Sequence, residues 1–393
     1  MYKSFVTPLK IVSGEGAINE VTEVMNNFGA KKIMVFADPG VIKAGVVEKL
    51  ETQLHSAGLD YQIYSDLQPE PPLQVGENAL QALKDFNADL VIGIGGGSSL
   101  DIAKAAAVLA ENEGSIQDYL NLTGTKALTN KGLPKILIPT TSGTGAEITD
   151  IAVFSLEDTK DVITHEYLLA DAAIVDPELT YTLPPKITAS TGVDALTHAV
   201  EALVSVNATP LTDALALEAI KKISSSIRVA VWNGSDREAR KNMSWGSTIA
   251  GMSFYNAGVS GVHALAYPLG GLFKIPHGES NAVLLPYIFD YIWPSCMDKM
   301  VLMADALGVL TENMNKRDAS LAAVKELKNL VQEVGIPMTL DKFGISEEDI
   351  DKLAENGLKQ TRLLARSPKP YSLEDIRDRY KAAYFGELVL GEK

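Results

Sequence analysis

The chain has 393 residues, of which 46% are hydrophobic and 22% charged, a balance typical of a globular protein with apolar material for two or three domains. Its formal net charge of -15 opposes binding to nucleic acids and to anionic membrane surfaces, so we expect neither as a partner. A single cysteine, Cys296, excludes an intrachain disulfide and a thiolate metal cluster, and it favours a cytoplasmic location. The first residues lack the apolar core of a signal peptide.

The first half of the chain alternates short apolar runs with amphipathic stretches. Six apolar runs have the length and composition of strands: 32–37, 61–64, 89–94, 134–139, 151–154 and 172–175. Three stretches between them have helical spacing: 45–54, 75–86 and 101–109. Strands that alternate with helices predict a mostly parallel sheet with helices on its faces.

The pattern changes after about Pro185, where strand signals nearly disappear. Five long segments have helical spacing: 192–206, 211–232, 235–254, 284–306 and 319–334. The two prolines of Leu183-Pro-Pro-Lys interrupt the chain at this change. We therefore predict an α/β domain over residues 1–184 and an all-α domain over residues 185–393.

A glycine-rich turn follows the strand at 89–94 and opens a helix. It reads Gly95-Gly-Gly-Ser-Ser-Leu-Asp101. Glycines let a ligand approach the backbone closely, and the helix N-terminus offers free N–H groups to a phosphate. The turn predicts pyrophosphate binding; the alternative is a tight turn that binds nothing.

Two further polar segments follow predicted strands. The loop Pro139-Thr-Thr-Ser-Gly-Thr-Gly-Ala-Glu147 carries four hydroxyl groups, which either face a ligand or bond their own backbone. Asp38 ends the strand at 32–37, where a carboxylate can bond an adenosine ribose and favour NAD over NADP. The alternative for Asp38 is an Asp-Pro-Gly turn.

Three of the five histidines, His198, His263 and His277, lie in one stretch of the second half of the chain. Asp194 precedes His198 by four residues, so the two side chains share one face if the segment is a helix. One carboxylate and three imidazoles predict a site for divalent iron or zinc. The alternatives are unrelated buried histidines and a capping box from Thr191 to Asp194.

These segments together resemble the iron-containing (group III) alcohol dehydrogenase family over essentially the full chain. The resemblance rests on the glycine turn, the threonine loop, Ala173-Ile-Val-Asp-Pro-Glu-Leu-Thr180, Gly192-Val-Asp-Ala-Leu-Thr-His-Ala-Val-Glu201 and the segment from Ser260 to Gly278. It implies a dehydroquinate synthase-like two-domain architecture, with a Rossmann-like NAD-binding domain before an all-helical metal-binding and substrate domain, and an active site in the cleft between them.

The resemblance also implies a role for individual residues. The implied metal ligands, usually for Fe²⁺ and sometimes for Zn²⁺, are Asp194, His198, His263 and His277. The implied contacts to the cofactor are Asp38, Gly96, Gly97, Ser98, Thr140, Thr141, Thr144 and Lys160. The expected substrate pocket contains Phe254 and Leu363 by resemblance, and Ile151 because it lies near the threonine loop.

One position departs from many family members, which carry a histidine four residues after the third ligand. Here that position is Tyr267. Because a tyrosine has an ordinary pKa near ~10, compared with ~6.5 for histidine, we predict that Tyr267 orients substrate or water and that the proton leaves through the ribose hydroxyls and solvent.

The expected function is NAD(H)-linked oxidation of a short-chain primary alcohol, or reduction of its aldehyde, by a homodimer or higher homo-oligomer. Three alternatives remain: a hydroxyacid–oxoacid transhydrogenase or hydroxyacid dehydrogenase of the same family, a lyase like dehydroquinate synthase, and a non-catalytic metal- or nucleotide-binding protein. Arg362 or Arg366 would suit a substrate carboxylate, or would bond the C-terminal carbonyls of its own helix.

Overall fold

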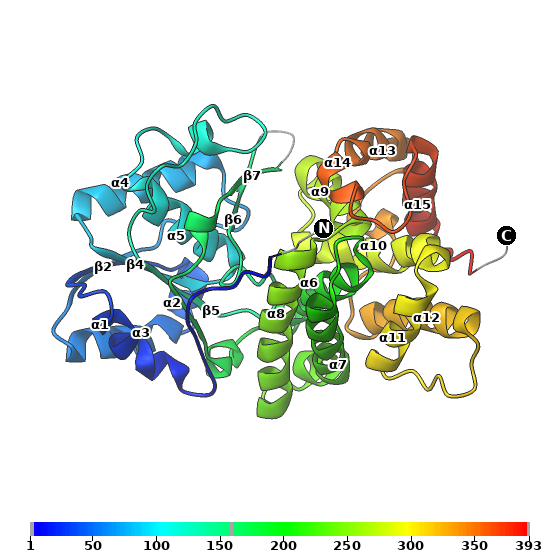
Figure 1. Cartoon of the computed structure of the whole chain (residues 1–393), viewed down its shortest axis with the longest axis horizontal. Helices are drawn as coiled ribbons and strands as arrows, with labels where there is room; N and C mark the ends of the chain where they lie inside the picture. The colour runs from blue at the N-terminus through cyan, green and yellow to red at the C-terminus, as the bar shows by residue number, and fades with distance from the viewer. Residues whose placement is uncertain (1–3, 157–159, 391–393) are drawn as a thin grey trace. The chain divides into compact units, whose positions relative to one another are not determined.

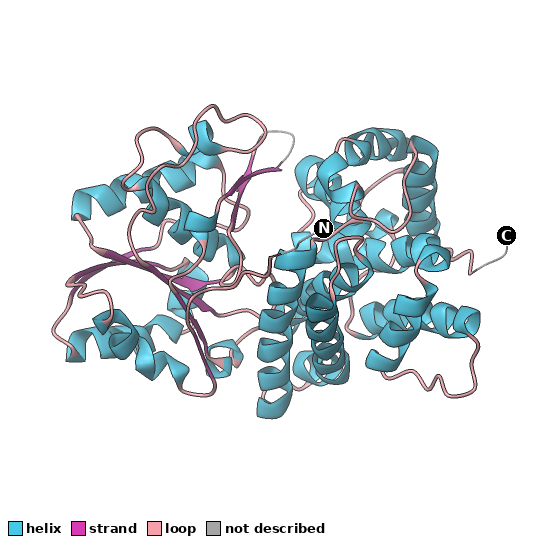
Figure 2. Ribbon diagram, in the orientation of Figure 1, coloured by secondary structure: helices cyan, strands magenta, loops and turns pink. Residues whose placement is uncertain are grey.

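A computed structural model describes residues 4–156 and 160–390. The chain divides into two compact units, one spanning Val6–Thr182 and the other Leu183–Lys393 with the first residues of the chain. Figure 2 shows the strands gathered in the first unit, while the second is drawn as helices and loops. In the described residues, no helix is long and apolar enough to cross a membrane.

The first unit is built on a six-stranded sheet in the order β1-β8-β5-β4-β2-β3, in which every neighbouring pair is parallel. Its strands are β1 (Ile11–Ser13), β2 (Lys32–Phe36), β3 (Asp60–Tyr64), β4 (Leu90–Gly95), β5 (Lys135–Pro139) and β8 (Ala172–Val175). An antiparallel hairpin of β6 (Ile151–Ser155) and β7 (Lys160–Thr164) lies outside this sheet. The predicted mostly parallel sheet is confirmed.

Helices cover both faces of the sheet because its central strands are buried on both sides. In β2, Ile33 and Val35 join the apolar core beneath α1 (Val21–Asn26) and α3 (Val46–Ser56), while Met34 and Phe36 join the core beneath α4 (Leu73–Phe86) and α5 (Gly97–Leu109). Figure 1 shows these two helix layers on opposite sides of the strands. A short helix, α2 (Pro39–Lys43), also belongs to this unit, with 3-10 turns at Ala17–Glu20, Ile116–Tyr119, Glu166–Leu168 and Pro177–Thr180.

The strand order places three predicted binding loops at one edge of the sheet. β2 leads outward to β3, whereas β4 lies on the other side of β2 and is followed by β5 and β8. The direction of the crossovers therefore reverses between β2 and β4, and open parallel sheets bind ligands at the carboxyl ends of strands at such a point. Asp38 follows β2, the glycine turn follows β4, and the threonine loop follows β5.

The second unit is helical throughout its described residues, as predicted. Its helices are α6 (Pro185–Val204), α7 (Pro210–Trp232), α8 (Arg237–Ala257), α9 (Gly261–Phe273), α10 (His277–Ile292), α11 (Met297–Ala306), α12 (Lys316–Glu333), α13 (Ile350–Leu358), α14 (Thr361–Leu364) and α15 (Leu373–Phe385). Short 3-10 turns lie at Trp293–Ser295, Leu340–Phe343 and Glu347–Asp349. One continuous apolar core joins α6 to α15.

One local expectation was wrong, and one helix was not predicted. The single helix expected over 284–306 is two helices, α10 and α11, separated by the turn at Trp293–Ser295. Pro294 lies in this turn and has no N–H to continue a helix. Helix α9 was not predicted, because its three glycines and Pro268 hide the helical pattern, yet it carries His263.

Candidate active site

The four predicted metal ligands all lie on helices of the second unit. Asp194 and His198 are one turn apart on α6, which confirms that they share a helix face. His263 lies in the first turn of α9, and His277 is the first residue of α10. The capping-box alternative for Thr191 is wrong, because α6 begins at Pro185 and the Thr191 hydroxyl donates to the carbonyl of Ile187 inside the helix.

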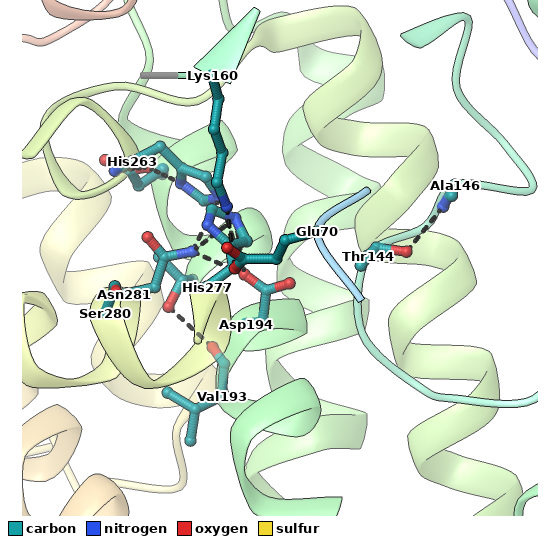
Figure 3. Close-up of polar contacts among 12 residues, drawn as sticks. Glu70, Thr144, Ala146, Lys160, Val193, Asp194, His263, His277, Ser280 and Asn281 are labelled. Atoms are coloured by element: carbon teal, nitrogen blue, oxygen red, sulfur yellow. Dashed lines mark hydrogen bonds and ion pairs between the residues drawn. The ribbon is translucent and has the colours of Figure 1, made fainter. Parts of the chain in front are cut away.

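Three of these residues bring their ligand atoms to one place. Atoms of Asp194, His263 and His277 that could hold a metal lie within 4.8 Å of one another. The amide nitrogen of Asn281 is 2.7 Å from Oδ1 of Asp194 and 3.2 Å from Nε2 of both His263 and His277 (Figure 3). An amide nitrogen has two hydrogens, so three acceptors converge on a group that cannot satisfy them all. One carboxylate and two imidazoles around a common point fit a divalent transition metal.

His198 lies beside this group of three residues. Its ring stacks on that of His263, with centroids 4.7 Å apart, and on that of Phe254, with centroids 4.1 Å apart. The structure therefore brings three of the four predicted ligands together and places the fourth in ring contact with one of them.

Burial and the neighbouring imidazoles have opposite effects on the pKa of Asp194. Burial alone would raise the pKa of this carboxyl, but His198, His277 and His263, together with the amide of Asn281, hold its pKa below the usual value. The carboxyl therefore stays ionised, as a metal ligand must be.

Glu201 is a site residue to which the sequence analysis assigned no role. It is fully buried on α6, and its carboxylate accepts hydrogen bonds from Nδ1 of His263 at 2.6 Å and from the amide of Val262 at 2.7 Å. Burial would raise the pKa of Glu201, but these bonds hold it lowered. Because Nδ1 of His263 donates to a carboxylate, its Nε2 keeps a lone pair for a metal. The sequence feature that could have identified Glu201 is its position seven residues after Asp194, on the same face of the helix.

The start of α10 depends on a glycine. A Cβ at Gly278 would lie 2.3 Å from the carbonyl oxygen of Ser190 on α6, so a larger residue would push the two helices apart. The glycine thus lets His277 approach the helix that carries Asp194.

The predicted catalytic residue of this unit and its predicted pocket residues lie close to the histidines or in the core. Tyr267 is one turn after His263, and its ring centroid is 6.1 Å from that of His277. Phe254 stacks on His198, and Leu363 is only 3% exposed among core residues of the unit. Ile151 belongs to the other unit, where it begins β6.

In the α/β unit, the glycine turn and the threonine loop pack against each other. Gly96 caps α5, and Gly97 is its first residue. A Cβ at Gly97 would lie 2.7 Å from Oγ1 of Thr144, and the amide of Thr140 donates to the carbonyl of Gly95 at 2.9 Å. The backbone at the start of α5 is therefore bare of side chains and faces hydroxyl groups, as a phosphate site requires.

Asp38 caps the short helix α2. Its Oδ1 accepts hydrogen bonds from the amides of Gly40 and Val41, and its Oδ2 accepts one from the hydroxyl of Ser99 at 3.3 Å. The Asp-Pro-Gly turn is thus formed, and the role at a ribose stays a prediction.

A buried ion pair that the sequence analysis did not single out holds the threonine loop in place. Nζ of Lys104 lies 2.8 Å from Oδ1 of Asp101 and donates to the carbonyls of Ala146, at 3.0 Å, and Ile151. Asp101 in turn accepts from the amide of Val153 at 3.0 Å. Burial raises the pKa of Asp101, and Lys104 opposes that shift.

Lys160, a predicted cofactor contact, begins β7 and forms an ion pair with Glu70 at 3.0 Å (Figure 3). Glu70 has a second link, because its amide donates to the hydroxyl of Ser98 at 3.1 Å. Nothing in the sequence pattern pointed to Glu70.

Comparison with known proteins shows the family. Residues 8–177 match the family model described as iron-containing alcohol dehydrogenase, and residues 188–384 match that of the Fe-containing alcohol dehydrogenase family, C-terminal. Long-chain-alcohol dehydrogenase 1 of Geobacillus thermodenitrificans is 56% identical over 96% of this chain and 95% of its own length. The 1,3-propanediol dehydrogenase of Citrobacter freundii is 36% identical over 94% of this chain and 96% of its own.

Solved structures agree with these matches. A crystal structure of 1,3-propanediol oxidoreductase superposes with a TM-score of 0.94 at 34% identity, covering 98% of this chain and 100% of that one. An alcohol dehydrogenase from Oenococcus oeni gives a TM-score of 0.93 at 34% identity, with the same coverage. The chain belongs to the iron-containing alcohol dehydrogenase family and is an oxidoreductase that interconverts alcohols and aldehydes.

Proposed function

We propose that this protein oxidises primary alcohols, and reduces their aldehydes, with NAD(H) and a divalent iron held by Asp194, His198, His263 and His277, with zinc as the alternative metal. The main support is the convergence of three ligand atoms on the amide of Asn281. When bound, the metal would supply a Lewis acid that polarises the alcohol or aldehyde oxygen, and the nicotinamide would accept or donate the hydride.

The chain's own residues prepare the site for this chemistry. Glu201 fixes the ring of His263 in one tautomer, and Phe254 stacks on His198 and limits its rotation. In the helical unit, the apolar side chains of Phe254 and Leu363 would exclude water from the substrate and help to hold its reacting carbon in position, and Ile151 of the α/β unit stays a predicted pocket residue.

Tyr267 is proposed to orient substrate or water through its hydroxyl group. Its place one turn after His263, with its ring near that of His277, supports this role. The proton is expected to leave through the ribose hydroxyls and solvent, since a tyrosine with an ordinary pKa near ~10 holds its proton at neutral pH.

The cofactor is proposed to bind the carboxyl edge of the sheet in the α/β unit. The backbone at Gly96 and Gly97 would hold the pyrophosphate, and Asp38 would bond the adenosine ribose and disfavour a 2′-phosphate. The remaining proposed contacts are Ser98, Thr140, Thr141, Thr144 and Lys160. NAD-linked relatives support the choice: an NAD-dependent methanol dehydrogenase of Bacillus methanolicus is 34% identical.

The chain length of the alcohol has two candidates. The apolar residues predicted for the pocket favour a short aliphatic chain, and the 1,3-propanediol and methanol dehydrogenases among the relatives act on such alcohols by name. The relative at 56% identity is named for long-chain alcohols, which supports an aliphatic pocket that also accepts longer chains. We propose unbranched primary alcohols as the substrate class.

The hydroxyacid alternative has one observation in its favour. Arg366 is half-buried against Gly258, and burial lowers the pKa of its guanidinium. Among the described residues, no side chain forms an ion pair with it, so it could meet a substrate carboxylate.

We also propose a homodimer or higher homo-oligomer in the cytoplasm. The single cysteine, Cys296, supports a reducing compartment, because the chain has no second cysteine with which to form an intrachain disulfide.

A substrate screen tests the proposal. Iron-loaded and zinc-loaded protein would be assayed for NAD reduction with unbranched primary alcohols of increasing length, diols and 2-hydroxyacids. We expect primary alcohols to give the highest kcat/KM. Turnover of hydroxyacids alone, or tightly bound cofactor that free NAD does not replace, would favour the hydroxyacid dehydrogenase or transhydrogenase instead.

A further inference from the structure

Glu70 has an unusual backbone conformation at the carboxyl edge of the sheet. It lies between Pro69 and Pro71 with a φ of 51°, in the left-handed region that non-glycine residues rarely adopt. Such strain persists only where the surroundings over-determine it, and it is found most often at functional sites.

The surroundings of Glu70 supply these constraints. Its amide donates to Oγ of Ser98 at 3.1 Å, and its carboxylate pairs with Nζ of Lys160 at 3.0 Å. The next residue, Pro71, accepts a hydrogen bond at 2.9 Å from the amide of Ser155 on β6. The segment after β3 is therefore fastened both to the start of α5 and to the β6–β7 hairpin.

Two adjacent serines at the start of α5 make contacts in different directions. Ser99 donates to Asp38, which follows β2, while Ser98 accepts from Glu70. Since Asp38 is proposed to hold the adenosine end of the cofactor and α5 its pyrophosphate, the other end extends toward β5 and the hairpin after it. Lys160 starts the second strand of that hairpin, and on this placement of the cofactor the Lys160–Glu70 pair would lie on the nicotinamide side.

The charge of this pair bears on a difference between the two forms of the cofactor. The side chain of Lys160 is only 7% exposed and that of Glu70 29% exposed, so solvent screens them incompletely. The nicotinamide ring is positively charged in NAD⁺ and neutral in NADH, while the rest of the molecule is the same. A lone ammonium here would favour NADH, and the carboxylate of Glu70 cancels that bias.

We propose that Glu70 is a positioning and charge-balancing residue of the cofactor site, which places Lys160 beside the nicotinamide and equalises the binding of NAD⁺ and NADH. The inference rests on the proposed NAD-linked function. On this proposal, Glu70 controls the ratio of the dissociation constants of NAD⁺ and NADH. The adenosine and pyrophosphate contacts are the same for both nucleotides, so they do not affect this ratio.

The test measures binding of NADH by fluorescence, and of NAD⁺ by competition, to the metal-loaded protein. For Glu70→Gln, which keeps the size but removes the charge, we expect Kd(NAD⁺)/Kd(NADH) to rise about three- to tenfold. Glu70→Asp should leave the ratio nearer that of the wild type, and Lys160→Met should shift it in the opposite direction. Glu111→Gln, which removes an exposed carboxylate of the same unit, is the matched control.

Thermal unfolding of each variant verifies that it is folded. An unchanged ratio for folded Glu70→Gln, or a shift in the same direction for Glu70→Gln and Lys160→Met, overturns the role of Glu70. If wild-type protein binds neither nucleotide, the proposed function itself fails. The two failures are therefore distinguishable.

Discussion

The carboxylate of Glu201 lies 2.6 Å from Nδ1 of His263, and both side chains are buried. This contact decides which ring nitrogen of His263 is available to a metal. It also joins α6, which carries Asp194 and His198, to the first turn of α9. The proposed metal centre therefore depends on a residue that does not itself reach the metal.

Glu201→Gln is expected to weaken metal binding about 10- to 100-fold, because an amide holds the imidazole less firmly and does not raise its basicity. Competition with a chelator of known affinity measures the change. Glu238→Gln is the control, since the side chain of Glu238 is 70% exposed. An unchanged affinity in a folded Glu201→Gln protein would contradict the role given to Glu201.

Asn281→Ala is expected to destabilise the metal-free protein by about 1–3 kcal/mol, because Asp194 loses a buried hydrogen bond of 2.7 Å. With metal bound, the cation neutralises the same acceptors, so the loss should be smaller. Urea unfolding with and without metal measures both values. Equal losses in the two states would argue that the acceptors around Asn281 do not bind the metal.

Lys104→Met is expected to destabilise the α/β unit by about 3–5 kcal/mol, because it leaves the carboxylate of Asp101 buried without its partner. Changing Asp101 to Asn as well should recover part of the loss, since no unpaired charge remains. Urea unfolding of the two single variants and the double variant tests this coupling. Strict additivity would show that the pair is not coupled.

Lys135 makes stability depend on pH in the alkaline range. Burial lowers the pKa of Lys135 from 10.5 to about 8, against the opposing effect of Asp171. Between about pH 8 and 10.5, Lys135 is protonated in the unfolded chain but has lost its proton in the folded protein. The free energy of unfolding therefore rises with pH over this range, and Lys135 contributes about 1–3 kcal/mol to the rise.

Lys135→Met should remove that rise and be no less stable than the wild type at neutral pH. Asp171 keeps its ion pair with Lys131 at 2.6 Å and a hydrogen bond of 3.0 Å from the amide of residue 135. The difference in unfolding free energy between the two proteins, followed from pH 7 to 10.5, isolates the effect of Lys135. A difference that does not change with pH would contradict it.

Much of the fold could be predicted because its signals are local. The strand expected over 32–37 is β2, Lys32–Phe36, and the helix expected over 211–232 is α7, Pro210–Trp232. Apolar runs and helical spacing identify such elements directly. Helix α9 could not be identified in this way, because its glycines have low helix propensity and are present for packing. At Gly261, for example, a Cβ would lie 2.4 Å from the hydroxyl of Tyr371, so no larger residue fits there.

The site was predictable where residue type alone suggests chemistry, as for Asp194 and the histidines. Partners that act through tertiary contacts could not be predicted. The roles proposed for Asn281 and Glu70 depend on contacts with residues that are distant in the sequence. Asn281 contacts Asp194, 87 residues away, and Glu70 contacts Ser98, 28 residues away. No spacing rule in the sequence connects such pairs.

The central claim is that one metal, held by Asp194, His198, His263 and His277, is required for alcohol oxidation. Titrating metal-free protein with Fe²⁺, while following NADH formation from a primary alcohol, tests it most directly. We predict that activity grows in proportion to bound metal and stops at one ion per chain, and that folded His277→Ala loses metal binding and activity together. Full activity in metal-free wild-type protein would contradict the claim.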